Sequence, residues 1–454
     1  MNRENIFKKI GNPLIRKNLK RFTLLVCVVF FSCNTMADYN FTQIQKNLSL
    51  GNYKLVLQEL ELNESEIYGQ KDEVLILLDK GVLSHFNSDY TESNVFLSNA
   101  EKLIDKYRAK SISQAVTSSV INDTVKDYAG EDFEDIYSNI FMSLNYLALG
   151  KYDDAMVEVR RFDNKLKNLK LKYKKELAEV NKSNKDVKVK EISVKFHDSA
   201  FARYLSLLMY RSQGDKDNAR IDYKYIKKAF ETQPTLYNFD MPKSLEQEFN
   251  IPPSMARMNF IVFSGSSPIK KEEIVRAYWG PETWYKLALP TMQKRPSVIN
   301  SIIVTLRNTT TGELTTQKLE LIESIENIVL DTFQQNYSVL YAKALIRSIS
   351  RAVSTSVLNE LSKEAQNQNM YATGLLLSVL DMASMVTTEV VERADVRVSR
   401  YFPGKVSVGE INILPGDYDV TIKYNSGASS IYSETKRITI KSNQLNLIES
   451  CCLK

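Results

Sequence analysis

The stretch that decides the fold is DFEDIYSNIFMSLNYLALGKYDDAMVEVRRFDNKL, residues 132–166. Its apolar and aromatic residues recur at helical spacing on both sides of a turn at Gly150. Either helix alone would leave an apolar stripe in water, so we expect the two helices to pack as an antiparallel hairpin. Tyr152 follows the turn, and Ala155, three residues later, is small enough for close approach of the two helices.

Three further units of this kind flank the first, at residues 41–60, 73–103 and 201–230. The position after the turn is occupied by Tyr53, Tyr90, Tyr152 and Lys216, and the short side chain three residues later by Val56, Ser93, Ala155 and Ala219. This pattern is typical of tetratricopeptide (TPR) repeats, whose period is about 34 residues. We therefore predict a TPR-like α-helical repeat domain over residues 33–235, interrupted by inserts, with a generic helical bundle as the alternative.

Two inserts account for the long intervals between units. The first, residues 107–131, ends in polar residues that weaken the helical pattern. The second, residues 165–190, is rich in lysine and contains a single aromatic residue, Tyr173. Binding to single-stranded nucleic acid needs aromatic stacking partners. We interpret the second insert as a long frayed helix or a solvated loop, and contact with an anionic partner is the alternative.

The N-terminal residues 1–32 predict an export signal. A basic part is followed by Phe22–Phe31, an apolar run too short to cross a bilayer as a helix. Ser32 and Cys33 come next and resemble the lipobox of bacterial lipoproteins, in which the signal is removed and the cysteine is acylated. We predict lipidation at Cys33. The alternatives are an ordinary signal peptide and an uncleaved anchor.

The charge balance argues against a nucleic-acid partner. Seven of the 60 Lys and Arg residues and one of the 54 Asp and Glu residues lie in residues 1–32, which leaves 53 of each for the rest of the chain. The basic excess therefore belongs to the signal segment and not to a binding surface. Asn34 differs from the Asp that retains some lipoproteins at the inner membrane. We therefore expect the protein to be anchored at the periplasmic face of the outer membrane.

The second half of the chain has the pattern of a β-rich domain. Pro242, Pro252 and Pro253 indicate a linker over residues 236–256. Short runs rich in β-branched and aromatic residues follow, separated by turn signals such as Pro415-Gly416-Asp417. The predicted strands are residues 258–263, 301–307, 314–321, 395–399, 405–414, 418–424, 435–440 and 445–448.

Two predicted helices, residues 336–363 and 370–391, interrupt these strands. The second is strongly apolar, but Asp381 lies at its centre. We interpret it as a buried core helix, with membrane contact as the alternative. The predicted fold class is α+β: an N-terminal TPR-like α-helical repeat domain, followed by a β-sandwich-like domain over residues 257–450 with an inserted helical pair.

Cysteine and histidine usage argues against metal or nucleophilic chemistry. The chain contains two histidines, His85 and His197, and no CxxC or GxSxG motif. We therefore predict no metal, no cofactor and no catalytic residues. Cys451 and Cys452 are adjacent near the C-terminus, and adjacent cysteines rarely bridge each other without strain. We expect them in a frayed tail, with a mixed or intermolecular disulfide as the alternative.

Four stretches together resemble a known protein family. They are SSVINDTVKDYAGEDFEDIYSNIFMSLNYLALGKYDDAMVEVRRFDNKL (118–166), MNFIVFSG (258–265), ALIRSISRAV (344–353) and ADVRVSRYFPGKVSVGEINILPGDYDVTI (394–422). In this order they resemble an uncharacterised family of bacterial envelope lipoproteins with TPR-like repeats. Members are often encoded beside lipoproteins that activate penicillin-binding proteins. The resemblance implies a role in cell-wall assembly or envelope maintenance, and it supplies no catalytic residues.

The function predicted from the sequence is a non-enzymatic, lipid-anchored scaffold that binds a protein or peptide partner through its repeats. The candidate contact residues flank the third helix pair: Asn122, Asp123, Tyr128, Glu131, Glu134, Arg160 and Arg161. Such residues also cap helices or join inserts to repeats, which is the interpretation we favour.

Two alternative functions remain open from the sequence. The first is an envelope hydrolase. Against it, Glu131 and Glu134 lie one helical turn apart on one face, whereas the paired carboxylates of glycosidases flank a substrate. The second is a membrane-active protein that acts through residues 370–391.

Overall fold

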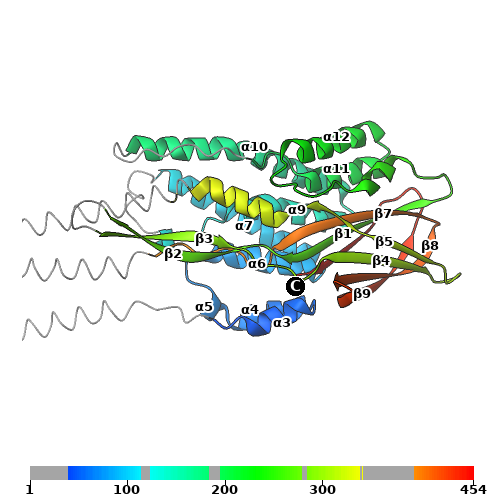
Figure 1. Cartoon of the computed structure of the whole chain (residues 1–454), viewed down its shortest axis with the longest axis horizontal. Coiled ribbons are helices and arrows are strands. Elements are labelled where there is room, and N and C mark those ends of the chain that lie inside the picture. The colour runs from blue at the N-terminus through cyan, green and yellow to red at the C-terminus, as the bar shows by residue number, and fades with distance from the viewer. Residues whose placement is uncertain (1–38, 114–122, 184–194, 279–283, 338–339, 341–392) are drawn as a thin grey trace, which may run out of the picture.

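The computed structural model of this chain describes residues 39–113, 123–183, 195–278, 284–337, 340 and 393–454. These residues form a mixed α+β fold (Figure 1). Several predictions lie outside the described residues: those for residues 1–32, Cys33, Asn122, the helix 370–391 and nearly all of the helix 336–363.

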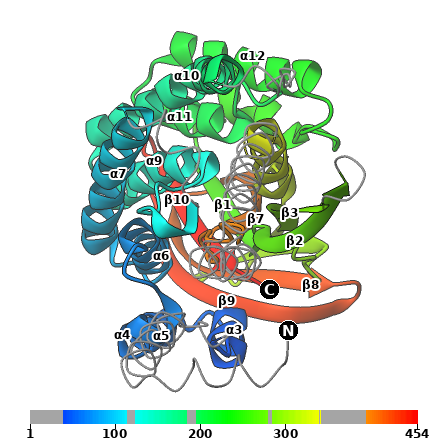
Figure 2. The same ribbon diagram turned by 90° about the vertical axis from the view of Figure 1, so that its left-hand side faces the viewer.

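The first part of the chain forms helix pairs at all four predicted places. The pairs are α3 (Thr42–Ser49) with α4 (Tyr53–Leu62), α6 (Glu73–Phe86) with α7 (Tyr90–Ser113), α9 (Asp132–Ala148) with α10 (Tyr152–Ser183), and α11 (Ala200–Ser212) with α12 (Lys216–Thr232). A short helix, α5 (Glu64–Ile67), and a 3-10 turn, η1 (Asp123–Val125), lie between pairs. Figure 2 shows the pairs along an arc, from α3 and α4 at the bottom to α11 and α12 at the top.

Local backbone conformation explains why each pair turns back on itself. Each turn contains a residue in the left-handed region: Gly51, Ser88, Gly150 and Gly214 have φ of 71°, 67°, 73° and 81°. A left-handed residue ends a helix, because it redirects the chain out of the helical path. The four predicted turn residues begin the second helices. The short side chains three residues later are fully buried between the paired helices.

The strands build two four-stranded sheets from the described residues. The first sheet has the order β10 (Asn446–Cys452), β1 (Ala256–Ser266), β7 (Pro403–Ile413), β6 (Glu320–Glu323). The second has the order β5 (Leu314–Lys318), β4 (Ser301–Asn308), β8 (Gly416–Ser426), β9 (Ser429–Ile440). β1 pairs with β10 in parallel, and the other pairings are antiparallel.

Strand alternation divides the interior into two cores. Met258, Phe260 and Val262 of β1 belong to a core shared with the second sheet. Ile261 and Phe263, on the opposite face of β1, belong to a core shared with the helices. The first sheet is therefore the middle layer, because side chains alternate between its two faces.

Phe263 lies where the helical arc meets the first sheet. Its ring centroid is 5.9 Å from that of Phe86 on α6, 5.6 Å from Phe141 on α9 and 5.8 Å from Phe201 on α11. Figure 2 shows β1, β7 and β10 inside the arc of helices. The chain's own first sheet therefore fills the inner face of the helical arc.

Two predictions about the C-terminal half are wrong. Residues 395–399 form no strand, because side chains take the backbone N–H groups that a neighbouring strand would bind. The Ser399 N–H donates to Glu134 of α9 at 2.5 Å, and the Arg397 N–H donates to Asp395 at 3.1 Å. Cys451 and Cys452 do not form a frayed tail. Both are buried free thiols in β10, which β1 holds in register.

Two other segments differ from the predicted pattern. The predicted strand 314–321 is split, because β5 joins the second sheet while β6 joins the first. A hairpin of β2 (Ile269–Tyr278) and β3 (Trp284–Gln293) was not predicted, and it extends toward the left in Figure 1.

The remaining elements connect these layers. The 3-10 helix η2 (Lys243–Phe249) precedes β1, and residues 325–337 form a helix after β6. Leu245 of η2 and Ile325, Ile328 and Val329 of the later helix are buried in the core shared by the helices and the first sheet. No helix within the described ranges is both long and apolar enough to cross a membrane.

Candidate functional site

Three predicted contact residues lie together in a buried polar cluster at the start of α9. Glu131 is the N-cap of α9 and forms a capping box with Glu134. The Glu131 N–H donates to Glu134 Oε2 at 2.6 Å, and the Tyr128 hydroxyl donates to the same oxygen at 2.7 Å. Burial, with a contribution from Glu131, raises the pKa of Glu134 to about 7.

Residues 393–402 cross this cluster as an irregular segment. Ser399 donates its N–H to Glu134 and its hydroxyl to Asp79 of α6, both at 2.5 Å. The Tyr68 hydroxyl donates to the other oxygen of Asp79 at 2.9 Å. Burial raises the pKa of Asp79 to about 7. Ser399 therefore joins two buried carboxyl groups that come from different helix pairs.

Arg397 holds the same segment at its outer side. Its guanidinium donates to Asp72 at 3.2 Å, to Asp395 at 2.8 Å and to the backbone oxygen of Lys126 at 3.0 Å. It also lies over the ring of Tyr128, 5.1 Å from the centroid. The arrangement ties η1, α6 and the 393–402 segment together. The buried carboxyl groups of Asp79 and Glu134 already accept hydrogen bonds from donors of the chain itself.

The other predicted contact residues lie elsewhere. Asp123 begins η1. Arg160 and Arg161 are on α10; Arg160 is exposed, and Arg161 forms ion pairs with Glu101 and Glu158. The structure therefore brings together Tyr128, Glu131 and Glu134, and it leaves Arg160 and Arg161 on a separate helix surface.

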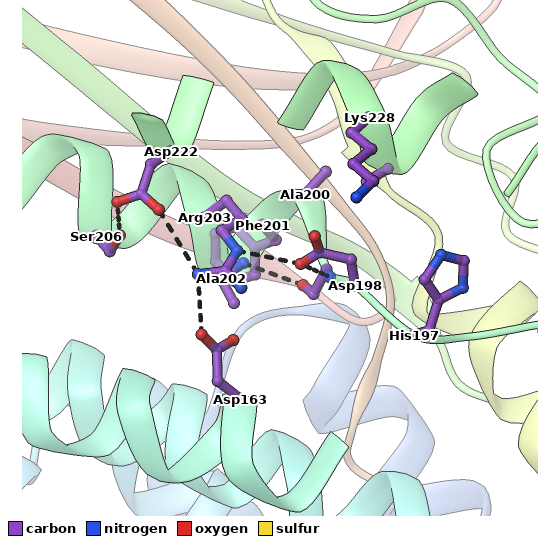
Figure 3. A network of polar contacts seen from close by, with 12 residues as sticks. Asp163, His197, Asp198, Ala200, Phe201, Ala202, Arg203, Ser206, Asp222 and Lys228 are labelled. Carbon is purple, nitrogen blue, oxygen red and sulfur yellow. Dashed lines mark hydrogen bonds and ion pairs between the residues drawn. The ribbon is translucent and has the colours of Figure 1, made fainter. Parts of the chain in front are cut away.

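A second polar cluster joins the last two helix pairs (Figure 3). Arg203 of α11 forms ion pairs with Asp163 of α10 at 2.9 Å, with Asp198 at 3.1 Å and with Asp222 of α12 at 3.6 Å. Ser206 donates to Asp222, whose pKa is raised to about 6 by burial. The guanidinium is surrounded by carboxylates from neighbouring elements, which is the arrangement of a structural ion-pair network.

An open cavity of about 390 Å³ lies between the second and third helix pairs, and we call it the α7–α9 groove. Thr91, Asn94, Val95, Ser98, Asn99 and Lys102 of α7 line one side, and Tyr146, Leu149 and Lys151 line the other. Val95 is 55% exposed and Leu149 39% exposed. Polar side chains and two lysines surround these apolar side chains, which is a composition suited to binding a peptide.

Sequence reasoning missed this groove for a physical reason. Its α7 residues alternate with buried positions such as Ser93 and Leu97, so they read as the ordinary solvent face of an amphipathic helix. The available signal was weak: Val95 and Leu149 are apolar residues that the helical pattern places outside the core. A single exposed apolar residue is common on protein surfaces. The pairing of the two becomes visible only once α7 and α9 are packed together.

Buried hydrogen bonds fix the two walls of the groove. The Asn145 side chain of α9 donates to Ser93 Oγ and to Asn94 Oδ1 of α7, each at 2.8 Å. Asn145 also contacts His85 Nδ1 at 2.6 Å, and His85 Nε2 contacts Glu449 of β10 at 2.5 Å. The groove is therefore preformed, because its walls are connected through α6 to the first sheet.

Within the described residues, no group of three or more His, Cys, Asp or Glu side chains could hold a metal ion. Comparison with protein-family models, with curated proteins and with solved structures found no match to this chain.

Proposed function

We propose that this protein is a lipid-anchored, non-enzymatic scaffold of the bacterial cell envelope that binds a protein or peptide partner. In this proposal the four helix pairs are TPR-like repeats and the two sheets are a β-sandwich. The α7–α9 groove carries the proposal, because it combines exposed apolar side chains with a polar, basic rim on two fixed helices.

The partner binds on the outside of the helical arc in this proposal. TPR-like repeats often present their inner face to ligands, but here Phe263 and the rest of the first sheet pack against that face. A peptide would have to displace a buried apolar layer to bind there. The α7–α9 groove needs no such rearrangement, because it is already open.

The groove favours an acidic, extended peptide segment of a partner protein. Lys102 and Lys151 are exposed and lie on opposite walls. Val95 and Leu149 offer apolar contacts between them. Ammonium groups attract carboxylates over several ångströms, and exposed apolar side chains stabilise the docked segment by burial.

The experiment is site-specific photo-crosslinking in the native envelope. A photoreactive amino acid replaces Val95 in the groove or, as the control, Ile221 on α12, which is also exposed. We expect a discrete adduct from position 95 and none from position 221. Lys102→Glu with Lys151→Glu removes the adduct, whereas Lys46→Glu on α3 leaves it. Equal adducts from both positions, or an adduct indifferent to the groove lysines, would contradict the proposal.

Membrane attachment is tested separately. We propose that Cys33 carries the lipid and that the protein faces the periplasm from the outer membrane. The Cys33→Ala variant should carry no lipid, keep its unprocessed signal segment and no longer reach the outer membrane. A variant that keeps both the location and the size of the wild type would show that the lipid prediction is wrong. The family resemblance is the support for a role in cell-wall assembly or envelope maintenance.

The hydrolase alternative has less support. Two carboxyl groups whose pKa values burial raises to about 7, Asp79 and Glu134, are buried and hydrogen-bonded to Ser399 and two tyrosines. Two others with raised pKa values, Asp222 and Glu410, accept hydrogen bonds from Ser206 and Tyr204. The α7–α9 groove contains no carboxylate among its lining residues. The membrane-active alternative depends on residues 370–391, outside the described residues. Solubility of the Cys33→Ala variant without detergent would argue against it.

A further inference from the structure

A second open cavity, of about 370 Å³, lies between η2 and the strands β5 and β6, and we call it the η2 pocket. Its lining side chains are all polar or charged: Lys243, Ser244 and Gln247 from η2, Gln317 and Lys318 from β5, and Glu320 from β6. It is unrelated to the α7–α9 groove, because no residue lines both. Its volume is in the range of small-molecule sites.

Glu320 is already engaged by the protein. Its carboxylate accepts the backbone N–H groups of Lys243 at 3.0 Å and Ser244 at 3.3 Å. Lys243 and Lys318 form no ion pair with any described residue, and both side chains are exposed. The pocket therefore offers two ammonium groups and an amide from Gln247 as donors toward a ligand.

Ser244 lies at the floor of the η2 pocket and is engaged from below. It is 7% exposed, and its hydroxyl interacts with Glu410 of β7, which favours the charged carboxylate, whereas burial raises the pKa of Glu410 to about 8. The hydroxyl oxygen itself is closed off from solvent. Contacts with a ligand therefore fall to Lys243, Gln247, Gln317 and Lys318.

The layer below the floor is incompletely paired. Arg257 of β1 is fully buried, and none of its guanidinium nitrogens has a hydrogen-bond partner among the described residues. Its nearest carboxylate is Glu248 of η2, 3.5 Å from Nε. Glu248 Oε2 pairs with Arg211 Nε at 2.8 Å, whereas one oxygen of Glu410 has no hydrogen bond among the described residues. This cluster places polar groups beneath the floor where a stable protein usually buries apolar ones.

We propose that the η2 pocket binds a small anionic molecule that also carries hydroxyl groups, of about the size of a monosaccharide acid or a sugar phosphate. Lys243 and Lys318 hold the carboxylate or phosphate by charge-assisted hydrogen bonds. Gln247 and Gln317 bind the hydroxyl groups, because an amide can both donate and accept hydrogen bonds. This binding is independent of the scaffold function and of its groove.

The test is a calorimetric titration of the folded protein with three probes: D-glucuronate, D-glucose 6-phosphate and neutral D-glucose. We expect an anionic probe to bind about tenfold more tightly than glucose, since a hydrogen bond to a charged group contributes roughly that factor. Preference for glucuronate identifies a carboxylate site, and preference for the phosphate identifies a phosphate site.

Matched variants assign the binding to the pocket. Lys243→Gln and Lys318→Gln should each weaken anion binding about tenfold, while Lys46→Gln on the distant helix α3 should not. Circular dichroism checks that each variant is folded. The proposal is overturned if no probe binds saturably in the millimolar range, if glucose binds as well as the anions, or if the pocket variants behave like Lys46→Gln.

Discussion

Replacing Phe263 by alanine tests whether the first sheet supports the helical arc. The Phe263 side chain is fully buried and touches aromatic rings from three helix pairs, through Phe86, Phe141 and Phe201. Truncating a buried phenylalanine to alanine typically lowers the free energy of unfolding by about 3–5 kcal/mol. Each favourable aromatic pair contributes about 0.5–1.5 kcal/mol beyond simple burial. We expect a loss near the upper end, about 4–5 kcal/mol, because three partners lose contact at once.

The assay is urea unfolding followed by far-ultraviolet circular dichroism, which reports mainly on the helices. A loss of this size is a large fraction of the total stability of a typical domain, about 5–15 kcal/mol. The matched control is Ile274→Ala on β2, because Ile274 is 46% exposed and should cost less than about 0.5 kcal/mol. A Phe263→Ala loss below about 1 kcal/mol would refute the reasoning, because the helices would then not depend on the sheet.

Three further predictions concern buried charges and turns. The folded-state pKa values of Asp79 and Glu134, about 7, lie above their ordinary values. The folded state therefore binds protons at these two groups more tightly than the unfolded state, which stabilises the fold at acidic pH, and this contribution is lost as pH rises through 7. The melting temperature should fall between pH 5.5 and pH 8.5, and it should fall less steeply in Glu134→Gln. An unchanged slope in that variant would contradict this. Gly150→Ala should lower the free energy of unfolding by about 1 kcal/mol in urea titrations, because alanine is strained at a φ of 73°. A Cβ at this position would meet no neighbouring atom, so the loss reports backbone strain alone. Ser88→Gly should be neutral or stabilising, and equal effects of the two variants would count against backbone strain. Arg203→Met should cost about 3 kcal/mol by the same titration, because three carboxylates lose their shared cation; a neutral result would show that the cluster is dispensable.

The helix pairs were accessible to sequence reasoning because their signals are local. Period-3.6 patterns and turn residues such as Gly150 and Tyr152 lie within a few residues of one another. All four pairs appear at the predicted places. Most strands of the two sheets were also found. β4 alternates as a strand with one buried face, and β1, which is buried on both faces, is visible as a short apolar run. The TPR-like nature of the pairs remains a prediction.

The missed features depend on contacts between distant parts of the chain. Residues 395–399 alternate polar and apolar residues like a strand, which would place Val396 and Val398 on one face. In the structure Val398 is buried and Val396 exposed, and the Ser399 N–H donates to Glu134 of α9. The hairpin of β2 and β3 carries charged, exposed residues such as Lys271 and Glu273, and its buried residues Ala288 and Leu289 are adjacent in sequence. No alternating apolar face therefore marked it as a hairpin. Filling of the helical arc by the first sheet requires contacts such as that between Phe141 and Phe263, which local patterns do not encode.

The same limit applies to the candidate site. The cluster of Tyr128, Glu131 and Glu134 was found in the sequence because a capping box has a short, fixed spacing. The contact of this cluster with Ser399 was not predicted, because 265 residues separate Ser399 from Glu134 in the sequence. The α7–α9 groove arises where two helices of different pairs meet. Its composition is informative only after packing has placed Val95 beside Tyr146 and Leu149.

The central claim is that the helical arc and the first sheet form one cooperative unit, which leaves the outer groove for a partner. Native-state hydrogen exchange with mass spectrometry tests it most directly, by comparing residues 136–144 of α9 with residues 258–264 of β1 in the wild type and in Phe263→Ala. The account predicts that the most protected amides of both segments exchange with the same opening free energy and lose protection equally in the variant. Loss of protection in β1 with unchanged protection in α9 would contradict the account, because the two layers would then unfold independently.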